Sequence, residues 1–297
     1  MAKYQIFTDS CSDMTPEMRY PNNIDYFRMV INVRGEDLEA DLDYKAYSAQ
    51  EIYDWIEDLN NRCKTSLIQV GEFIKRMRPY LEKGIDVFYI AVTSVLSGSY
   101  NTFRFAKEEL EKEFPDRKII AYNSTRAGMA LGMMVLDAAK MQQEGKEIED
   151  IIEYFDRDKQ KYNLCGTLAT LKYLKAAGRV SNAAAFFGDI IGIKPIIYGD
   201  TMGHNYVVKK VKGMRTALDT LVEHVKDITE GIEHPVIYLG QGKAQQSVDY
   251  LTKRFKEELG ATVIDYWIGP IIGINCGPGV IHICCMGKPM TLTAPEE

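Results

Sequence analysis

The chain has 297 residues, of which 46% are hydrophobic and 10% aromatic, the composition of a soluble globular protein. This length exceeds one ordinary hydrophobic core, so we expect two domains. The formal charge is −6, from 36 basic and 42 acidic residues. A net acidic chain without a basic run argues against nucleic acid or an anionic membrane as the main partner.

The cysteines and the first residues predict a cytoplasmic protein. None of the six cysteines forms a C-x-x-C pair, which fits free thiols in a reducing compartment. The sequence enters a strand-like run at residue 4, which leaves no room for a signal peptide. Residues 264–285 are largely apolar, but six glycines and prolines interrupt them. We therefore predict a strand, a Gly/Pro loop and a second strand there rather than a membrane span.

Strands and helices alternate in the first half of the chain. The predicted strands are residues 4–8, 85–92 and 118–122, and the predicted helices start after Ser48, at Ser97 and at residue 127. Ser48 and Glu51 have the spacing of a capping box. Alternation of this kind predicts a parallel sheet with right-handed crossovers.

The second half follows an α+β pattern with an antiparallel component. After a charged helix at residues 147–161, a short helix at 168–177 ends at Gly178. The further predicted elements are a hairpin of strands 193–198 and 206–211, helices 213–229 and 243–259, and strands 235–239, 262–267 and 280–286. We place the domain boundary near residue 160, giving domains 1–160 and 161–297.

The sequence lacks most of the motifs that are typical of metal, nucleotide or nucleophile sites in enzymes. The four histidines are scattered, as expected of surface residues, and nothing in the sequence predicts a metal site. Gly240-Gln241-Gly242 could begin a dinucleotide turn or be a plain strand-to-helix turn; the third glycine of the dinucleotide motif is missing. There is no phosphate-binding G-x-x-x-x-G-K-[ST] loop and no G-x-S-x-G elbow.

Hydroxyl side chains gather where predicted strands end. They are Thr8, Ser10, Thr65, Ser66, Thr93, Ser94, Ser97 and Ser124. Carboxyl ends of parallel strands line one crevice, where ligands usually bind. Ser97 also has the position of a helix N-cap, where backbone N–H groups favour an anion. Each residue alone is better explained as a helix cap; their convergence from several segments is what indicates a binding site.

Six segments, in order, resemble the DegV family of bacterial fatty-acid-binding proteins over nearly the whole chain. They are Thr8-Asp9-Ser10-Cys11-Ser12-Asp13, Thr65-Ser66, Thr93 to Tyr100, Leu171 to Ser181, Lys194-Pro195-Ile196, and Gly269 to Gly273 with Gly277-Pro278-Gly279. The resemblance implies a three-layer α/β/α N-terminal domain with a mainly parallel sheet. It also implies a two-layer α+β C-terminal domain with a mixed or antiparallel sheet.

The resemblance further implies a non-catalytic carrier with no cofactor besides its ligand. A long-chain fatty acid would lie in a tunnel, and a separate fatty acid kinase would be the partner. Thr65 and Ser97 would hold the carboxylate, with Ser66 and Ser94 beside them and Arg179 and Asn275 on nearby loops. Asn275 stands where relatives often carry a histidine, and Leu67-Ile68 replaces the family's Gln-Pro after the hydroxyl pair.

Two choices stay open at this level. The helix at 127–141 is apolar on all faces and rich in methionine, so Met129 and Met133 belong either to a tunnel wall or to an ordinary core. A carrier and an acyl-sensing regulatory protein would share the same pocket. A nucleotide-dependent enzyme is a weaker alternative, because it needs a phosphate-binding loop or an acid/base pair.

Overall fold

The computed structural model describes residues 3–58, 61–179 and 192–293. The elements in chain order are β1 (Tyr4–Asp9), α1 (Pro16–Arg19), η1 (Tyr20–Asn22), β2 (Ile24–Phe27), β3 (Val30–Val33), β4 (Glu36–Glu39), α2 (Ala49–Glu57), β5 (Lys64–Ser66), α3 (Val70–Leu81), β6 (Asp86–Ala91), α4 (Ser99–Glu113), β7 (Ile119–Asn123), α5 (Gly128–Gln143), α6 (Ile148–Asp158), η2 (Lys159–Lys161), β8 (Tyr162–Thr167), α7 (Lys172–Ala177), β9 (Ile193–Gly199), β10 (Asn205–Lys212), α8 (Met214–Ile228), β11 (Val236–Gly242), α9 (Gln245–Leu259), β12 (Thr262–Trp267), α10 (Pro270–Cys276) and β13 (Val280–Met286).

The N-terminal half is built on a parallel sheet with the strand order β2-β1-β6-β7. Strands β1 and β6 are buried almost throughout, which accounts for the nearly continuous apolar sequence of β6. Helices α3 and α4 pack on one face, and α5 packs on the other. The parallel three-layer arrangement expected from the sequence is therefore confirmed.

The C-terminal half contains a six-stranded sheet with the order β10-β9-β8-β13-β11-β12. Only β11 and β12 pair in parallel among its described strands, so the predicted mixed sheet is also confirmed. Helices α8 and α9 cover its outer face. In chain order, the strands of the parallel sheet precede η2 and the strands of the six-stranded sheet follow it, near the predicted domain boundary. A division at residue 160 stays a prediction.

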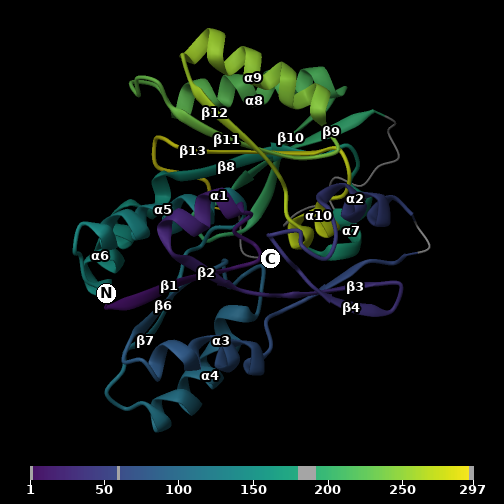
Figure 1. Ribbon diagram of the computed structural model, residues 1–297. Helices are drawn as coiled ribbons and strands as arrows, with labels where there is room; N and C mark the ends of the chain where they lie inside the picture. Colours follow the sequence, from purple (N-terminus) through teal and green to yellow (C-terminus); the bar gives the residue numbers. More distant parts are fainter. Residues whose placement is uncertain (1–2, 59–60, 180–191, 294–297) are drawn as a thin grey trace.

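Helix α5 lies between the two sheets (Figure 1). It contacts β1 and β6 on one side and β8 and β13 on the other. Each of its sides therefore faces other parts of the protein, which explains why its sequence is apolar around the whole circumference. One continuous hydrophobic cluster links both halves through this helix.

A three-stranded sheet, β4-β3-β5, was not expected from the sequence. Its strands are three or four residues long, and β4 carries three acidic residues in four positions. Segments this short, two of them mostly polar, have little of the apolar alternation that predicts a strand. This sheet matters for function because β5 carries Thr65 and Ser66.

Two local predictions need correction. Residues 264–285 form strand, helix and strand, because the expected Gly/Pro loop contains α10. Pro270 occupies the first turn of that helix, where its missing N–H costs nothing. Gly98, rather than Ser97, is the N-cap of α4. The capping box at Ser48 and Glu51 and the end of α7 at Gly178 are confirmed.

Within residues 3–58, 61–179 and 192–293, no helix has the length and apolarity needed to cross a bilayer. In the same part of the chain no group of three or more His, Cys, Asp or Glu side chains is placed to hold a metal ion.

Candidate functional site

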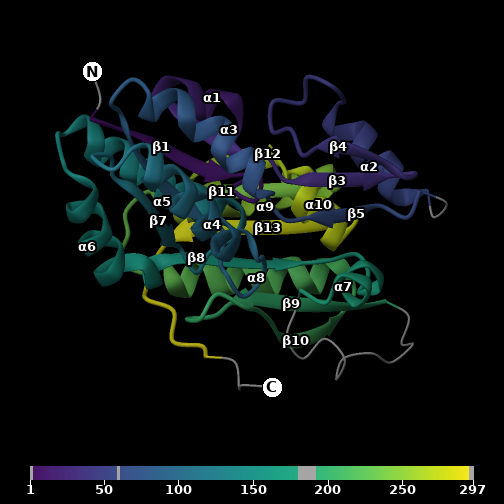
Figure 2. The same cartoon turned by 90° about the horizontal axis from the view of Figure 1, so that it is seen from below.

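A cavity of about 450 Å³ opens between the carboxyl ends of the first sheet and the inner face of the second. Its volume falls in the range of small-molecule sites, roughly 300–1,000 Å³. Segments β3 to β5, α7 and α10 gather at the same end of the molecule (Figures 1 and 2). The cavity is lined by Cys11, Met29, Thr65, Ser66, Leu67, Gln69, Val92, Leu96, Ser97, Gly98, Ala127, Leu164, Leu174, Arg179, Asn205, Ile271, Ile272, Asn275, Cys276 and His282.

The structure brings Thr65, Ser66 and Ser97 together on the N-terminal wall. Strand β5 continues into a segment in which the N–H of Ile68 donates to Ser99 Oγ at 3.1 Å. Ser99 Oγ lies 3.0 Å from Ser97 Oγ, and the Ser99 N–H donates to Ser97 Oγ at 3.3 Å. These bonds fix the end of β5 against the first turn of α4, and the positive end of a helix dipole favours an anion.

The other five strand-end hydroxyls are not among the described residues that line the cavity. Thr8 Oγ1 donates to the carbonyl of Ile90, and Ser10 Oγ donates to the carbonyl of Ala40 at 2.9 Å. Thr8, Ser10, Thr93 and Ser124 are buried, and none of the four is among the described residues that line the cavity. Ser94 is likewise outside this lining, with its Oγ accepting from Asn123 Nδ2 at 2.8 Å. The structure therefore does not bring Ser94 to the site.

Arg179 and Asn275 both line the cavity. Arg179 is exposed just after Gly178, and in the described part of the chain its guanidinium donates to the backbone carbonyls of Leu96 and Ala177. Asn275 Nδ2 donates to the carbonyl of Ile271 one turn earlier in α10 at 2.7 Å. A cation and a side-chain amide thus border the hydroxyl wall. Val180 and Ser181, which belong to the same motif, lie outside the described residues.

Met129 and Met133 do not support a tunnel wall in this cavity. Met129 is fully buried in the core between the sheets, with its sulfur close to Gly132. Met133 borders a different cavity, near Pro235 and Tyr238. Both residues belong to the hydrophobic core cluster, and neither is among the described residues that line this cavity. The apolar wall comes instead from residues such as Val92, Leu164 and Ile271.

Two buried carboxyl groups, Asp9 and Asp13, hold backbone that borders the cavity; the sequence analysis named both within a family motif but not as site residues. Asp9 accepts from the N–H of Cys11 at 2.9 Å and of Val92 at 2.8 Å, two residues that line the cavity. Asp13 Oδ1 accepts from the N–H of Gly269 at 3.0 Å, at the start of α10. Burial raises the pKa of Asp9, and it raises the pKa of Asp13 to about 8. Both side chains anchor backbone next to the site.

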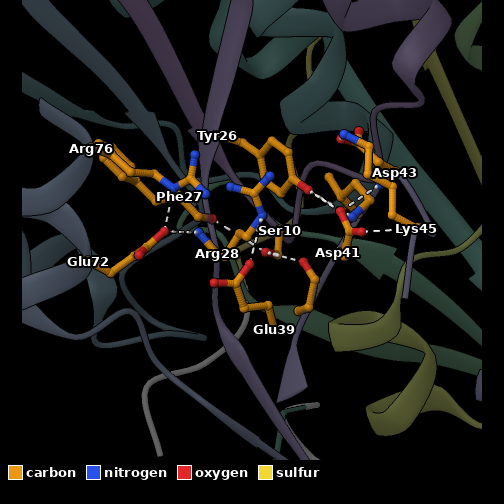
Figure 3. Close-up of polar contacts among 12 residues, drawn as sticks. Ser10, Tyr26, Phe27, Arg28, Glu39, Asp41, Asp43, Lys45, Glu72 and Arg76 are labelled. Atoms are coloured by element: carbon orange, nitrogen blue, oxygen red, sulfur yellow. Dashed lines mark hydrogen bonds and ion pairs between the residues drawn. The ribbon is translucent and has the colours of Figure 1, made fainter. Parts of the chain in front are cut away.

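A polar network anchors the segment that leads into the three-stranded sheet (Figure 3). Ser10 Oγ accepts from the N–H of Met29, and Arg28 pairs with Glu39 at 3.2 Å. Tyr26 donates to Asp41 at 2.7 Å, and Asp41 accepts the N–H groups that follow it. This network fixes β3 and β4, and through β3 it fixes the register of Thr65, which pairs with Ile31.

His282 is a lining residue that the sequence prediction missed. Scattered histidines were expected at the surface, but this one lies on β13 in the middle of the second sheet and borders the cavity. Burial lowers its pKa to about 4, so the imidazole is neutral at pH 7. Asn205, at the start of β10, borders the same space. The signal in the sequence that could have indicated this residue is a single histidine within an otherwise apolar strand.

The DegV family model, described as an uncharacterised protein family, matches residues 3–288. A DegV domain-containing protein from Clostridium perfringens is 28% identical over 293 residues, which cover 97% of this chain and 98% of the relative.

Two solved structures are similar over the whole fold. A DegV family protein from Thermus thermophilus, described with fatty acid binding, has a TM-score of 0.85 and 22% identity, covering 96% of this chain and 99% of that one. The fatty acid kinase B3 protein of Streptococcus pneumoniae, loaded with linoleic acid, has a TM-score of 0.82 and 17% identity, covering 96% and 100%. With a family match across residues 3–288, this chain belongs to the DegV family.

Proposed function

We propose that the protein binds a long-chain fatty acid in the cavity between its two sheets. The observation that carries the proposal is the cavity itself, which joins an apolar interior to a wall of hydroxyls beside an arginine. The carboxylate would lie at Thr65 and Ser97, with Ser66, Asn275 and Arg179 nearby. The fatty acids described for the relatives from Thermus thermophilus and Streptococcus pneumoniae support this ligand class.

Burial of the acyl chain would supply most of the affinity. Each buried methylene contributes about 0.8 kcal/mol, so a chain of roughly sixteen carbons contributes on the order of 10 kcal/mol before the costs of binding. A hydrogen bond to a charged group contributes only about 1.5–3 kcal/mol. The hydroxyls would therefore mainly orient the acid and satisfy a carboxylate that is costly to bury unpaired.

Thr65→Ala and Ser97→Ala are each expected to weaken fatty acid binding by about 1–3 kcal/mol. Both hydroxyls would contact the same carboxylate, so the double variant should lose less than the sum of the two single losses. A displacement titration with a labelled fatty acid measures all four proteins. Ser94→Ala is the matched control, because Ser94 lies outside the described lining, and it should bind like the wild type. Unchanged affinity in the double variant would show that the carboxylate lies elsewhere.

We further propose that the protein is a carrier that presents the bound acid to a fatty acid kinase and does no chemistry itself. Support comes from the kinase in the name of the Streptococcus pneumoniae relative and from the lack of a phosphate-binding motif in the sequence. Incubated alone with ATP, magnesium and fatty acid, the chain should form no acyl phosphate, detected as hydroxamate. Product without an added kinase would place the protein among the enzymes.

A further inference from the structure

The most informative unexplained group in the molecule is the imidazole of His282. Its Nδ1 is buried and has no hydrogen-bond partner among the described residues. An unpaired buried nitrogen costs folding free energy, so a polar group of this kind needs an explanation. The imidazole borders the proposed fatty acid cavity and also a small cavity of about 20 Å³ beside it.

The sheet is built to leave room for this ring. His282 pairs with Gly166 of β8 and with Gly240 of β11. A Cβ atom at Gly166 would lie 3.2 Å from His282 Cδ2 and 2.4 Å from the carbonyl oxygen of Ile281. A larger residue at Gly166 would therefore crowd the ring. On its inner side, a Cβ atom at Gly128 would lie 3.6 Å from His282 Nδ1, which places that nitrogen beside the start of α5.

The surroundings of the ring are mostly apolar. Leu164, Leu174 and Ile272 border the main cavity with it, and Ile197 borders the small one. Among the described residues, the polar groups at the small cavity besides the ring are Asn205 and the thiol of Cys276, a weak donor, which both border the main cavity too, and Thr167, whose hydroxyl already donates to the carbonyl of Pro195 at 2.7 Å. His282 and Asn205 thus form a small polar region on the C-terminal wall, on a different element from the hydroxyls of β5 and α4.

A plain alkyl chain has no atom that can satisfy this region. A neutral imidazole offers one donor and one acceptor, and the amide of asparagine offers both kinds of group. A hydroxyl group likewise donates and accepts, so it can pair with either nitrogen state of the ring and with the amide. A keto oxygen only accepts. Hydroxyl is therefore the substituent that fits the region best.

We propose that His282 and Asn205 form a hydrogen-bonding subsite within the acyl cavity and that the preferred ligand is a hydroxylated long-chain fatty acid. The inference rests on the proposed function, since it assumes that an acyl chain occupies this cavity. His282 is then a specificity-determining residue, and it takes no part in holding the carboxylate.

The test compares stearic acid with stearic acids hydroxylated at successive positions along the chain, by competition against one labelled fatty acid. The position that faces His282 should bind about tenfold more tightly than stearic acid, because one additional buried hydrogen bond is made. His282→Leu should remove this preference and bind stearic acid as tightly as the wild type or more tightly. His282→Gln, which keeps a donor and an acceptor, should retain part of it.

Three other outcomes would contradict the subsite, the role of His282 in it, or fatty acid binding itself. Equal affinity of the wild type for stearic acid and every hydroxylated acid would overturn the subsite and leave fatty acid binding intact; a water in the small cavity would then satisfy the imidazole. An equal loss for both acid types in His282→Leu would assign the ring to the carboxylate instead. Binding of neither acid type by the wild type would overturn the proposed function and the subsite together.

Discussion

Asp13→Asn is expected to raise the free energy of unfolding at pH 7 by about 3 kcal/mol. Asp13 is buried and its pKa is raised to about 8, chiefly because burial disfavours the charged carboxylate. An aspartate in the unfolded chain ionises near pH 4, at about its model-peptide value. Between these two pH values the folded state therefore holds one proton more than the unfolded state.

The direction of the effect follows from this proton count. The stability of the wild type is greatest, in this contribution, below about pH 4 and falls by about 1.4 kcal/mol per pH unit until the folded carboxyl ionises near pH 8. Asparagine has no such loss, which gives an advantage of about 4 kcal/mol at pH 7. An unpaired amide hydrogen in place of Oδ2, which has no hydrogen-bond partner among the described residues, reduces this by about 1 kcal/mol.

The substitution preserves what the side chain does structurally. Asparagine keeps Oδ1 as the acceptor for the N–H of Gly269, and it tolerates the left-handed conformation of residue 13, whose φ is 54°. Urea unfolding of both proteins from pH 4 to pH 9 measures the effect. Asp116→Asn, at an exposed aspartate, is the control and should change stability by no more than about 0.5 kcal/mol. A stability difference that does not depend on pH would show that Asp13 is ionised in the folded protein.

The layers of the fold could be predicted because its strands and helices carry strong patterns. Strand β6 is an almost continuous apolar run, which burial on both faces explains, and turn residues separate the strands of the antiparallel β9–β10 hairpin. Sheet β4-β3-β5 was missed because its strands are only three or four residues long and β4 and β5 are mostly polar. Strand β5 also pairs with β3 across the long segment that contains α2, and such a contact has no local periodicity.

The candidate site could be predicted only in part, for a related reason. Hydroxyls at strand ends are visible in the sequence, but which of them face a cavity depends on packing between the two halves. Ser97 and Ser94 are three residues apart in one loop, yet Ser97 lines the cavity and Ser94 pairs with Asn123. His282 and Asn205 come from strands that neither pair with each other nor lie close in sequence. Their proximity to one cavity is a property of the tertiary structure.

Leu96→Trp is expected to weaken binding of a long-chain fatty acid about thirtyfold. Leu96 lines the cavity between the hydroxyl wall and Arg179, whose guanidinium contacts its carbonyl oxygen. An indole ring here would occupy the volume of two or three methylene groups, and each methylene excluded from the cavity forfeits about 0.8 kcal/mol. The resulting loss of about 2 kcal/mol corresponds to that thirtyfold change in the dissociation constant.

The neighbouring residue provides a matched control for Leu96→Trp. Val95 is 45% exposed and lies outside the described cavity lining, so Val95→Trp adds the same ring to the same loop but directs it to solvent. It should bind fatty acid as the wild type does. Titration of both variants with acids of increasing length adds a second criterion. Because the indole removes volume and leaves Thr65 and Ser97 in place, short acids that fit the remaining space should lose less affinity than long ones. An equal loss at every length would mean that the tryptophan disturbs the carboxylate site, and unchanged binding in Leu96→Trp would show that the acyl chain does not occupy this cavity.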